Sequence, residues 1–433
     1  MNQNRCSLYI SYFGIRQPLV QTQVIPYLIE LAKVGWSVHL MTFEPDWPEN
    51  FSEVEIHQIQ QSLRNKGIIW HPEKYTKSHS LFSKLKDIYY GVKAARKIIR
   101  THQVSIIHGR AHVATAIGWL AGLFQKRKLL FDIRGLKAEE QVESGQWTKS
   151  GLNFQLLKFM ERLLLSRASG FVVLTHAGRK ALFPQAISNP DLPSDMFLLP
   201  DGRPVQIIPC CVDTTRCIPN GQAVVSNKTE LKKKLGLENC SRLIVHLGAL
   251  GGLYPEDRIV AVFEEIHRND PDTGLLVISQ APTDTLIRLY KEAGLPESHL
   301  WTGRVGVTEV IGYLSLCDWG LSVKHESHSQ LFCSPTKIPE YLLAGLPILA
   351  SRGIGDTDEI LKDHDIGIVF NALDRSSIRD AVQQMPSLKR DASLPDRCRK
   401  IATLVFNLQD IGGKRYQALY EVLLGDDQLR VGK

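Results

Sequence analysis

The residues best suited to chemistry lie in segment 332–351, FCSPTKIPEYLLAGLPILAS, where a lysine and a glutamate occur three positions apart. Ser334 is a favourable N-cap residue, and Pro335 suits the first position of a helix. Gly345, in the sequence AGLP, is a typical helix end. We therefore predict a helix over residues 335–344.

The start of this helix has the groups that a nucleotide needs. Thr336, Lys337 and Glu340 share one helix face because they are three or four positions apart. A diphosphate there would meet free N–H groups, the Ser334 and Thr336 hydroxyls and the Lys337 ammonium group. Glu340 could accept hydrogen bonds from a ribose diol. Alternatively, Ser334 is only a cap and Glu340 forms a surface ion pair with Lys337; spacing does not decide between these interpretations.

A second group of candidates follows a predicted strand in the sequence FDIRG. Asp132 and Arg134 lie at the carboxyl end of that strand, where ligands of open parallel sheets bind. Arg134 could bind a phosphate or a sugar hydroxyl, with Asp132 as a helper. The alternative, which we favour slightly, is that Arg134 pairs with Asp132 or Glu139 and holds the loop.

The first predicted turn between a strand and a helix contains Gly14 and Arg16 in FGIRQPLVQTQ. A single glycine is a weak signal, and a tight turn explains it equally well.

Metal sites are not indicated. The sequence Asp356-Thr357-Asp358 is similar to a metal-binding DxD motif, but it follows a strand and opens a helix, which favours N-capping. His102, His108 and His112 have no further ligand at metal spacing. The eight cysteines form no CxxC pair, which fits reduced thiols in a cytosolic protein.

These candidates are positioned by alternating strands and helices. In the first half we predict strands over residues 8–13, 38–43, 54–59, 105–108, 129–133, 171–174 and 205–208, and helices over 21–34, 81–101, 113–123 and 152–166. In the second half we predict strands over 243–247, 275–279, 319–323, 348–350 and 368–370, and helices over 255–268, 283–293, 307–316, 335–344 and 409–424.

This alternation predicts an α/β protein with two Rossmann-like, doubly wound domains that face a cleft. We place an N-terminal, acceptor-side domain at residues 1–210 and a nucleotide-sugar-binding domain at 226–405, joined by a Gly/Asn/Ser-rich link near 219–228. We expect the C-terminal helix, within 409–426, to pack back on the first domain.

Composition excludes several classes of protein. With 433 residues, 43% hydrophobic and 22% charged, the chain can bury two or three cores and is neither disordered nor collagen-like. The N-terminus is too polar for a signal peptide, and no run of about 18 apolar residues could span a bilayer. We expect a cytoplasmic protein that could touch a membrane only peripherally, at its inner face.

The charge is unevenly distributed. Residues 1–205 hold 26 basic and 16 acidic side chains, a balance of +10, whereas the remaining residues hold 26 and 29, a balance of −3. The excess peaks at 64–100, within which the predicted helix 81–101 has an apolar stripe that includes Leu85 and Tyr89. An ordinary amphipathic helix with a solvated basic face is favoured about 2:1 over a membrane-surface or anion-binding helix.

The chain also resembles a known family. Several segments are similar to those of the retaining GT-B glycosyltransferases of group one, also called glycosyltransferase family four. They are the helix sequence QTQVIPYLIELAKVG after a Gly-containing loop, then IIPCCVDTTRC, and finally EYLLAGLPILAS followed by Gly367-Ile368-Val369. The resemblance extends from Tyr9 to Leu424 and includes an SPTK variant of the donor helix. It implies that Glu340 holds the donor ribose and that the N–H groups of 334–337 bind the diphosphate. It also implies that the loop with Gly14 and Arg16 approaches the donor diphosphate and the acceptor.

Three departures from the family pattern stand out. Phe332 replaces the glutamate that in the family contacts the transferred sugar, and FDIRG replaces a segment that often carries a histidine. In HLGALGGLYPEDR, where Gly248 is a further donor-binding candidate, Ala249 and Pro255 occupy positions that are commonly Arg and Lys. The charge of the leaving diphosphate must then be neutralised by Lys337, Lys324 or Arg304.

The resemblance implies retaining, metal-independent hexosyl transfer from a nucleotide-diphosphate sugar, UDP- or GDP-linked, to a hydroxyl of a glycan or lipid-linked acceptor in polysaccharide or glycoconjugate biosynthesis. The catalytic candidates are Asp132, Arg134, Lys337 and Glu340. We expect no cofactor, no metal and no nucleic-acid partner. The alternatives are a GT-B nucleotide-sugar epimerase or phosphorylase, or a non-catalytic glycan- or nucleotide-binding partner of a transferase.

Overall fold

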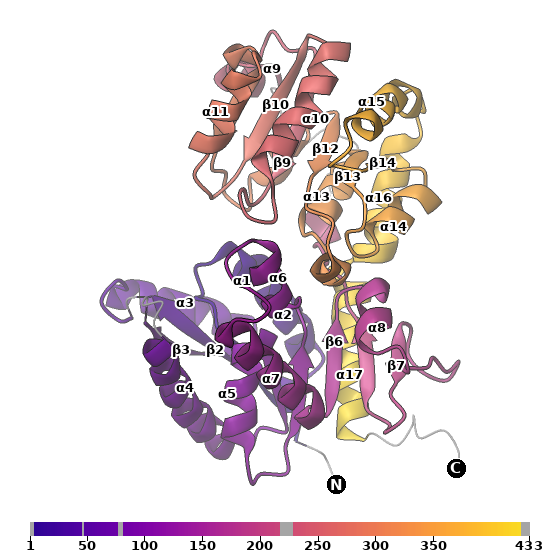
Figure 1. Ribbon diagram of the computed structural model, residues 1–433. Helices are drawn as coiled ribbons and strands as arrows, with labels where there is room; N and C mark the ends of the chain where they lie inside the picture. Colours follow the sequence, from indigo (N-terminus) through magenta and orange to yellow (C-terminus); the bar gives the residue numbers. More distant parts are fainter. Residues whose placement is uncertain (1–3, 46, 77–80, 217–227, 426–433) are drawn as a thin grey trace. The chain divides into compact units, whose positions relative to one another are not determined.

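The computed structural model describes residues 4–45, 47–76, 81–216 and 228–425, which form two compact units (Figure 1). Unit 1 comprises Met1–Val142, Trp147–Pro209 and Leu408–Lys433. Unit 2 comprises Glu143–Gln146 and Cys210–Asn407. The predicted link near 219–228 lies outside the described residues, except for its last residue.

Unit 1 is built on an eight-stranded sheet with the order β3-β2-β1-β4-β5-β6-β8-β7, in which the pair β7–β8 is antiparallel and the other pairs are parallel. Its strands are β1 (Cys6–Ser11), β2 (Ser37–Pro45), β3 (Ile68–Tyr75), β4 (Ile106–Arg110), β5 (Lys128–Asp132), β6 (Gly170–Val173), β7 (Met196–Leu198) and β8 (Pro204–Ile207). Helices cover the sheet, so the inner strands β1, β4 and β6 are buried along their whole length.

The helices of this part of the chain are α1 (Pro18–Gln23), α2 (Ile25–Lys33), α3 (Glu53–Asn65), α4 (Leu81–Thr101), α5 (Ala111–Gly122), α6 (Lys137–Glu143), α7 (Leu152–Arg167), α8 (His176–Leu182) and α17 (Lys414–Leu424). The π-helical turn η5 (Leu408–Gly413) precedes α17. Figure 1 shows α4, α5 and α7 side by side over one face of the sheet. Although α17 is last in the sequence, it belongs to unit 1.

Unit 2 has a six-stranded, fully parallel sheet with the order β11-β10-β9-β12-β13-β14. Its strands are β9 (Arg242–Leu247), β10 (Thr273–Ile278), β11 (Leu300–Gly303), β12 (Trp319–Ser322), β13 (Ile348–Ser351) and β14 (Gly367–Phe370). Its α-helices are α9 (Lys228–Lys234), α10 (Glu256–Asn269), α11 (Asp284–Glu292), α12 (Val310–Leu314), α13 (Lys337–Leu343), α14 (Thr357–Asp363), α15 (Arg375–Lys389) and α16 (Leu394–Phe406). Short 3₁₀ turns are η1 (Thr214–Arg216), η3 (Glu297–His299) and η4 (His328–Phe332).

The predicted fold class, two α/β domains with parallel sheets, is confirmed. The strand predicted at 54–59 is wrong, because those residues lie in α3. The Ser52 hydroxyl accepts a hydrogen bond from the Glu55 N–H and caps that helix. The β-branched residues that suggested a strand lie on a largely exposed helix. The strand that pairs with β2 at the edge of the sheet is instead β3.

The helix predicted at 21–34 is divided into α1 and α2. Val24 between them has φ −127° and ψ −67°, and Pro26 stands at the start of α2. Proline lacks an N–H donor and restricts the residue before it, so the first helix ends there. The strands β3, β7 and β11 were not predicted, because their sequences are short or contain proline and charged residues.

The apolar stripe predicted along α4 is also partly wrong. The buried face of α4 includes Asp87, Ala95 and Ile99, whereas Leu85 and Tyr89 are exposed. Asp87 can be buried because its carboxylate accepts hydrogen bonds from the Tyr12 hydroxyl and from residue 76. The outer face of α4 is therefore apolar as well as basic.

Candidate functional site

Within unit 2, the candidate site lies where the strand order reverses. From β9 the chain builds outward through β10 and β11, and it then returns to β12 on the other side of β9. Loops at the carboxyl ends of two such strands diverge and leave room for a ligand. The loops are residues 248–255, which follow β9, and residues 323–336, which follow β12.

The first loop is shaped by glycines. Gly248 has φ +115°, a conformation that L side chains rarely adopt, and a Cβ at this position would lie 3.5 Å from Lys337 Cε. Two reciprocal hydrogen bonds between Gly251 and Tyr254, 2.9 and 3.0 Å long, close a small hairpin. The hairpin places the Tyr254 ring beside the lysines of the second loop and of α13.

Lys337 is the first residue of α13, and its side chain is buried. Its Nζ atom has no hydrogen-bond partner in the part of the chain that the structure describes and lies 5.1 Å from the centre of the Tyr254 ring. Burial lowers the pKa of Lys337 to about 7, and the nearby charge of Lys324 contributes to the shift. The hydrogen-bonded surface pair with Glu340, our alternative, therefore does not form.

Lys324 is the second buried lysine of this site. It lies at the carboxyl end of β12, where its backbone N–H donates to Ser351 Oγ at 2.9 Å. Its Nζ atom lies 3.0 Å from Cys333 Sγ and 4.6 Å from the centre of the Tyr254 ring. Burial alone would lower the pKa of Lys324, but Cys333 and Tyr254 outweigh burial and raise that pKa. Two lysines thus converge on one aromatic ring.

The start of α13 differs from the prediction. Thr336, not Ser334, occupies the N-cap position, and its side chain makes no capping hydrogen bond. The Ser334 hydroxyl instead accepts a hydrogen bond from the Cys210 N–H at 3.1 Å. Pro335 is buried before the helix begins, and Thr336 is exposed. The helix ends as predicted, with Gly345 in the left-handed region at φ +81°.

The remaining donor-side candidates of unit 2 lie around this pair of lysines. Glu340 lies in the first turn of α13 and is half-buried. Phe332, where the family has glutamate, is fully buried in the core of unit 2. Arg304 is exposed and follows the edge strand β11, three places from β12 in the sheet. The structure therefore brings Gly248, Lys324 and Lys337 together, with Arg304 on the edge strand.

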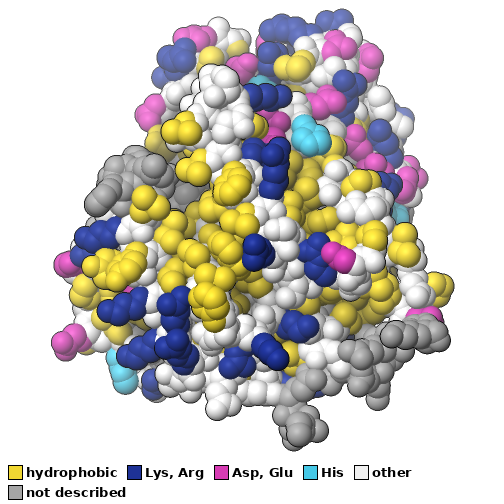
Figure 2. Space-filling model, turned by 60° about the horizontal axis from the view of Figure 1, so that its bottom comes forward, with side chains coloured by type: hydrophobic (Ala, Val, Ile, Leu, Met, Phe, Trp, Pro, Cys, Tyr) yellow, Lys and Arg dark blue, Asp and Glu magenta, His cyan; other side chains and the backbone are white. Residues whose placement is uncertain are grey.

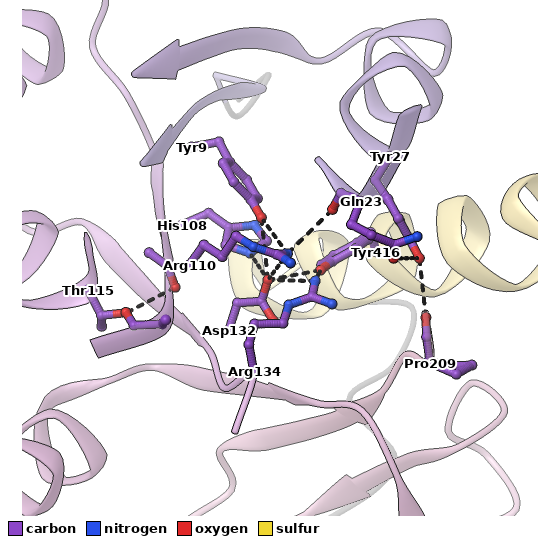
Figure 3. Close-up of polar contacts among 12 residues, drawn as sticks. Tyr9, Gln23, Tyr27, His108, Arg110, Thr115, Asp132, Arg134, Pro209 and Tyr416 are labelled. Atoms are coloured by element: carbon purple, nitrogen blue, oxygen red, sulfur yellow. Dashed lines mark hydrogen bonds and ion pairs between the residues drawn. The ribbon is translucent and has the colours of Figure 1, made fainter. Parts of the chain in front are cut away.

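In unit 1, Asp132 is the centre of a buried polar cluster (Figure 3). Its Oδ2 atom accepts hydrogen bonds from Arg134 Nη2 at 2.7 Å and from the Tyr416 hydroxyl at 3.2 Å. Tyr9 and His108 lie 3.4 Å from the same oxygen, and Arg110 lies at 3.8 Å. Burial alone would raise the pKa of Asp132, but Arg134, His108 and Arg110 hold it well below its ordinary value.

Arg134 also donates a hydrogen bond to the Tyr416 hydroxyl at 2.7 Å. The loop-holding pair of Arg134 with Asp132 is thus the alternative that the structure shows. Tyr416 comes from α17, so this cluster joins the C-terminal helix to the strand ends of unit 1 (Figure 3). The catalytic roles predicted for Asp132 and Arg134 remain predictions.

The turn after β1 is occupied by contacts within unit 1. A Cβ at Gly14 would lie 2.7 Å from Glu44 Oε2, so close packing requires glycine there. Arg16 forms an ion pair with Glu55 at 2.5 Å and stacks on the Phe51 ring at 3.7 Å. Gly14 and Arg16 therefore belong to a different unit from the paired lysines, and a donor-binding role for them stays a prediction.

The described residues contain no group of three or more His, Cys, Asp or Glu side chains that could hold a metal ion. Asp356 takes the N-cap position of α14 but makes no capping bond; the Asp358 carboxylate instead accepts the Gly353 N–H at 3.1 and 3.2 Å. His108 bonds within the Asp132 cluster, and His112 contacts Glu161.

Sequence reasoning missed Tyr254 and Cys333. The only sequence signal for Tyr254 was the run of glycines before it, which predicts a tight turn but not the position of the ring. Cys333 stands beside the predicted helix cap, and its contact with Lys324 depends on the fold of η4.

Residues 227–404 match the family described as "Glycosyl transferases group 1". Three solved structures share the fold of the whole chain. They are a glycosyltransferase from Rickettsia africae ESF-5 (13% identity, TM-score 0.69, covering 99% of this chain and 100% of that chain), sucrose-phosphate synthase from Thermosynechococcus elongatus (14%, 0.71, 98% and 100%), and Anabaena HepE in complex with UDP and glucose (14%, 0.67, 96% and 99%). No curated protein matches this sequence.

At such identities the structural similarity shows the GT-B fold and nothing finer. The family match covers the part of the chain that holds Gly248, Lys324, Lys337 and Glu340. Most of unit 2 thus matches the model of this family, and both buried lysines lie in the matched part.

Proposed function

We propose that this protein transfers a sugar from a nucleotide-diphosphate sugar to a hydroxyl acceptor, with retention of anomeric configuration and without a metal ion, in glycan or glycoconjugate biosynthesis. The proposal is supported chiefly by the buried Lys337 ammonium nitrogen, which has no hydrogen-bond partner among the described residues. A buried cation without a partner lowers stability, and a bound diphosphate would supply the missing anionic partner.

The lysine pair accounts for the chemistry that the leaving group requires. When the bond between the anomeric carbon and the diphosphate oxygen breaks, negative charge grows on the diphosphate and positive charge on the sugar. Lys337 and Lys324 lie 5.1 and 4.6 Å from the centre of one ring, and we propose that they stabilise that negative charge in a low-dielectric environment. They take over the role of the Arg and Lys that the resemblance leads one to expect at positions 249 and 255.

The remaining steps need no enzyme nucleophile. The acceptor oxygen forms the new bond on the face from which the diphosphate departs, and the departing phosphate oxygen takes the acceptor proton. We propose that Glu340 binds the donor ribose and that the sugar itself meets other contacts, because Phe332 removes the usual glutamate. A UDP-linked donor is a reasonable first choice, since the related Anabaena structure contains UDP and glucose.

The proposal is tested by donor-dependent turnover of single variants. We expect Lys337→Ala and Glu340→Ala each to lower turnover by about 10²-fold or more, as for the loss of a group that stabilises developing charge. Lys400→Ala, on the exposed side of α16, is the matched control and should leave turnover unchanged. Near-normal rates in both site variants would remove the basis of this assignment.

The same samples distinguish the alternatives. A nucleotide-sugar epimerase would interconvert donors without acceptor, and a phosphorylase would consume inorganic phosphate. A non-catalytic partner would bind nucleotide or glycan but release no diphosphate.

A further inference from the structure

The surface of unit 1 has an unusual concentration of exposed apolar side chains. Among the described residues, fourteen large hydrophobic side chains are exposed, and seven of these lie on α4, at the end of α5 or on α7. They are Leu85, Tyr89, Tyr90, Phe124, Leu152, Leu156 and Phe159. We call the outer surface of these three helices, with the residues 123–128 that follow α5, the outer helix face. Exposed apolar patches of this kind mark interaction sites.

The three helices form one continuous surface. Arg96 Nη2 of α4 donates to the Leu120 carbonyl of α5 at 2.9 Å. The Arg167 guanidinium of α7 lies 5.8 Å from the centre of the Trp119 ring of α5. The middle helix α5 thus contacts both neighbours, and Figure 2 shows hydrophobic side chains on this face with lysine and arginine side chains beside them.

The charge of the outer helix face has a single sign. Segments 81–101, 111–128 and 152–167 contain twelve Lys and Arg but only two acidic residues, Asp87 and Glu161. Both acids are buried, Asp87 against Tyr12 and Glu161 against His112. No described carboxylate is therefore exposed on these segments to offset the basic side chains, so a partner must tolerate or carry negative charge.

Phe124 is the most exposed apolar side chain of this face. It is fully exposed, and its backbone has φ +65°, which is uncommon for a residue other than glycine. The sequence that follows it is Gln-Lys-Arg-Lys. An aromatic ring held outward beside three basic residues is the arrangement expected of a side chain that enters the headgroup region while lysines meet lipid phosphates.

We propose that the outer helix face docks on the surface of an anionic lipid bilayer. Aromatic and aliphatic side chains would enter the interface, and the nearby Lys and Arg side chains would be attracted to the anionic headgroups. No helix in the described residues is long and apolar enough to cross a membrane. The consequence that the acceptor is lipid-linked rests on the proposed function, whereas the docking itself does not.

The test is co-sedimentation of the full-length protein with vesicles of phosphatidylcholine alone or of 70% phosphatidylcholine and 30% phosphatidylglycerol. One variant removes apolar contacts (Tyr89→Ser, Tyr90→Ser and Phe124→Ser), and another reverses charge (Lys93→Glu, Lys97→Glu and Arg100→Glu). Arg96 is left intact because it bonds to α5. The matched control changes exposed apolar residues of unit 2, Leu373→Ser and Leu404→Ser.

We expect the wild type and the control to bind the anionic vesicles but not the neutral ones, with affinity that falls as salt rises. Each outer-face variant should bind at least tenfold more weakly while its affinity for UDP or GDP stays unchanged. A wild type that does not bind anionic vesicles, or outer-face variants that bind like the control, would overturn the proposal. So would a DNA duplex that binds more tightly than vesicles. If the wild type binds neither UDP nor GDP, the result counts against the proposed function and not against membrane docking.

Discussion

The Lys337 ammonium nitrogen and the Tyr254 ring lie 5.1 Å apart, and Lys324 is held 4.6 Å from the same ring. Attraction to an aromatic face compensates only partly for the desolvation of a buried ammonium group. Lys324 also contacts Cys333, whereas Lys337 has no hydrogen bond among the described residues. Burial of Lys337 therefore has a desolvation cost that a bound anion would offset.

Replacing Lys337 by methionine should stabilise the protein while it weakens nucleotide binding. The folded-state pKa of Lys337, about 7, is below the ordinary lysine value of 10.5, so the unfolded chain binds more protons between these values. Stability therefore rises with pH from 7 to 10.5, and the cost of burying the charge is fully present below pH 7. At about 1.4 kcal/mol per pKa unit, we expect the free energy of unfolding of Lys337→Met at pH 6 to exceed that of the wild type by a few kcal/mol. The variant should therefore unfold at a higher temperature.

Thermal unfolding at pH 6 and pH 10 measures this effect. The difference in unfolding temperature between Lys337→Met and the wild type should be smaller at pH 10 than at pH 6. The control Lys400→Met should unfold at the wild-type temperature at both pH values. A variant that is less stable than the wild type at pH 6 would mean that Lys337 has a stabilising partner.

Removing Lys324 should raise the pKa of Lys337. Lys324 is the second cause of the lowered pKa, after burial, because two like charges lie near each other. In Lys324→Met, titration of Lys337 followed by NMR of labelled lysines should move up from about 7, yet remain below 10.5 because burial persists. An unchanged titration would show that the two ammonium groups do not interact.

A side chain at Gly248 should disturb the site from the β9 loop. Gly248→Ala would strain the backbone at φ +115° and place a methyl group 3.5 Å from Lys337 Cε. We expect its affinity for UDP or GDP to fall about tenfold. Gly252→Ala is the matched control, since Gly252 also has positive φ, +58°, but nothing lies within 4 Å of an added Cβ. If the two substitutions change nucleotide affinity equally, the nucleotide does not bind beside Gly248 and Lys337.

The Asp132 cluster should matter for the stability of unit 1. Asp132→Asn removes the buried negative charge that faces Arg134 and Arg110, and breaking a buried ion pair typically costs about 3–5 kcal/mol. Tyr416→Phe removes one hydrogen bond to the same oxygen and should cost about 1 kcal/mol. Calorimetric unfolding checks both values, and nucleotide affinity of the folded variants should be unchanged. If Asp132→Asn unfolds like the wild type but loses turnover, Asp132 acts in the reaction rather than in the fold.

Local patterns were sufficient for much of the fold. The buried apolar runs and the glycine after α13 predicted the parallel sheets and the end of that helix. The start of α13 was misplaced by two residues because Ser334 bonds to the Cys210 N–H, 124 positions away in the sequence. The capping preference of a serine cannot reveal that its hydroxyl already has a distant partner.

Only part of the candidate site could be predicted from local patterns. Lys337, Lys324 and Gly248 follow strands or begin a helix, so their positions could be inferred from the order of elements. The burial of both lysines and their shared contact with Tyr254 depend on the hairpin that Gly251 closes, which no periodicity encodes. The Asp132 cluster likewise combines residues from β1, β4, β5 and α17, whose approach is known only from the fold.

Calorimetric titration of UDP and GDP between pH 7 and pH 9 shows directly whether the buried Lys337 binds a diphosphate. The terminal phosphate of each nucleotide is mostly doubly ionised in this range, because the second pKa of such a phosphate is about 6. An anion would raise the Lys337 pKa from about 7, so binding should take up a proton and affinity should fall as pH rises. In Lys337→Met, affinity should be at least tenfold weaker and independent of pH. Equal affinities of the two proteins, or binding without proton uptake at pH 8, would contradict diphosphate binding by Lys337.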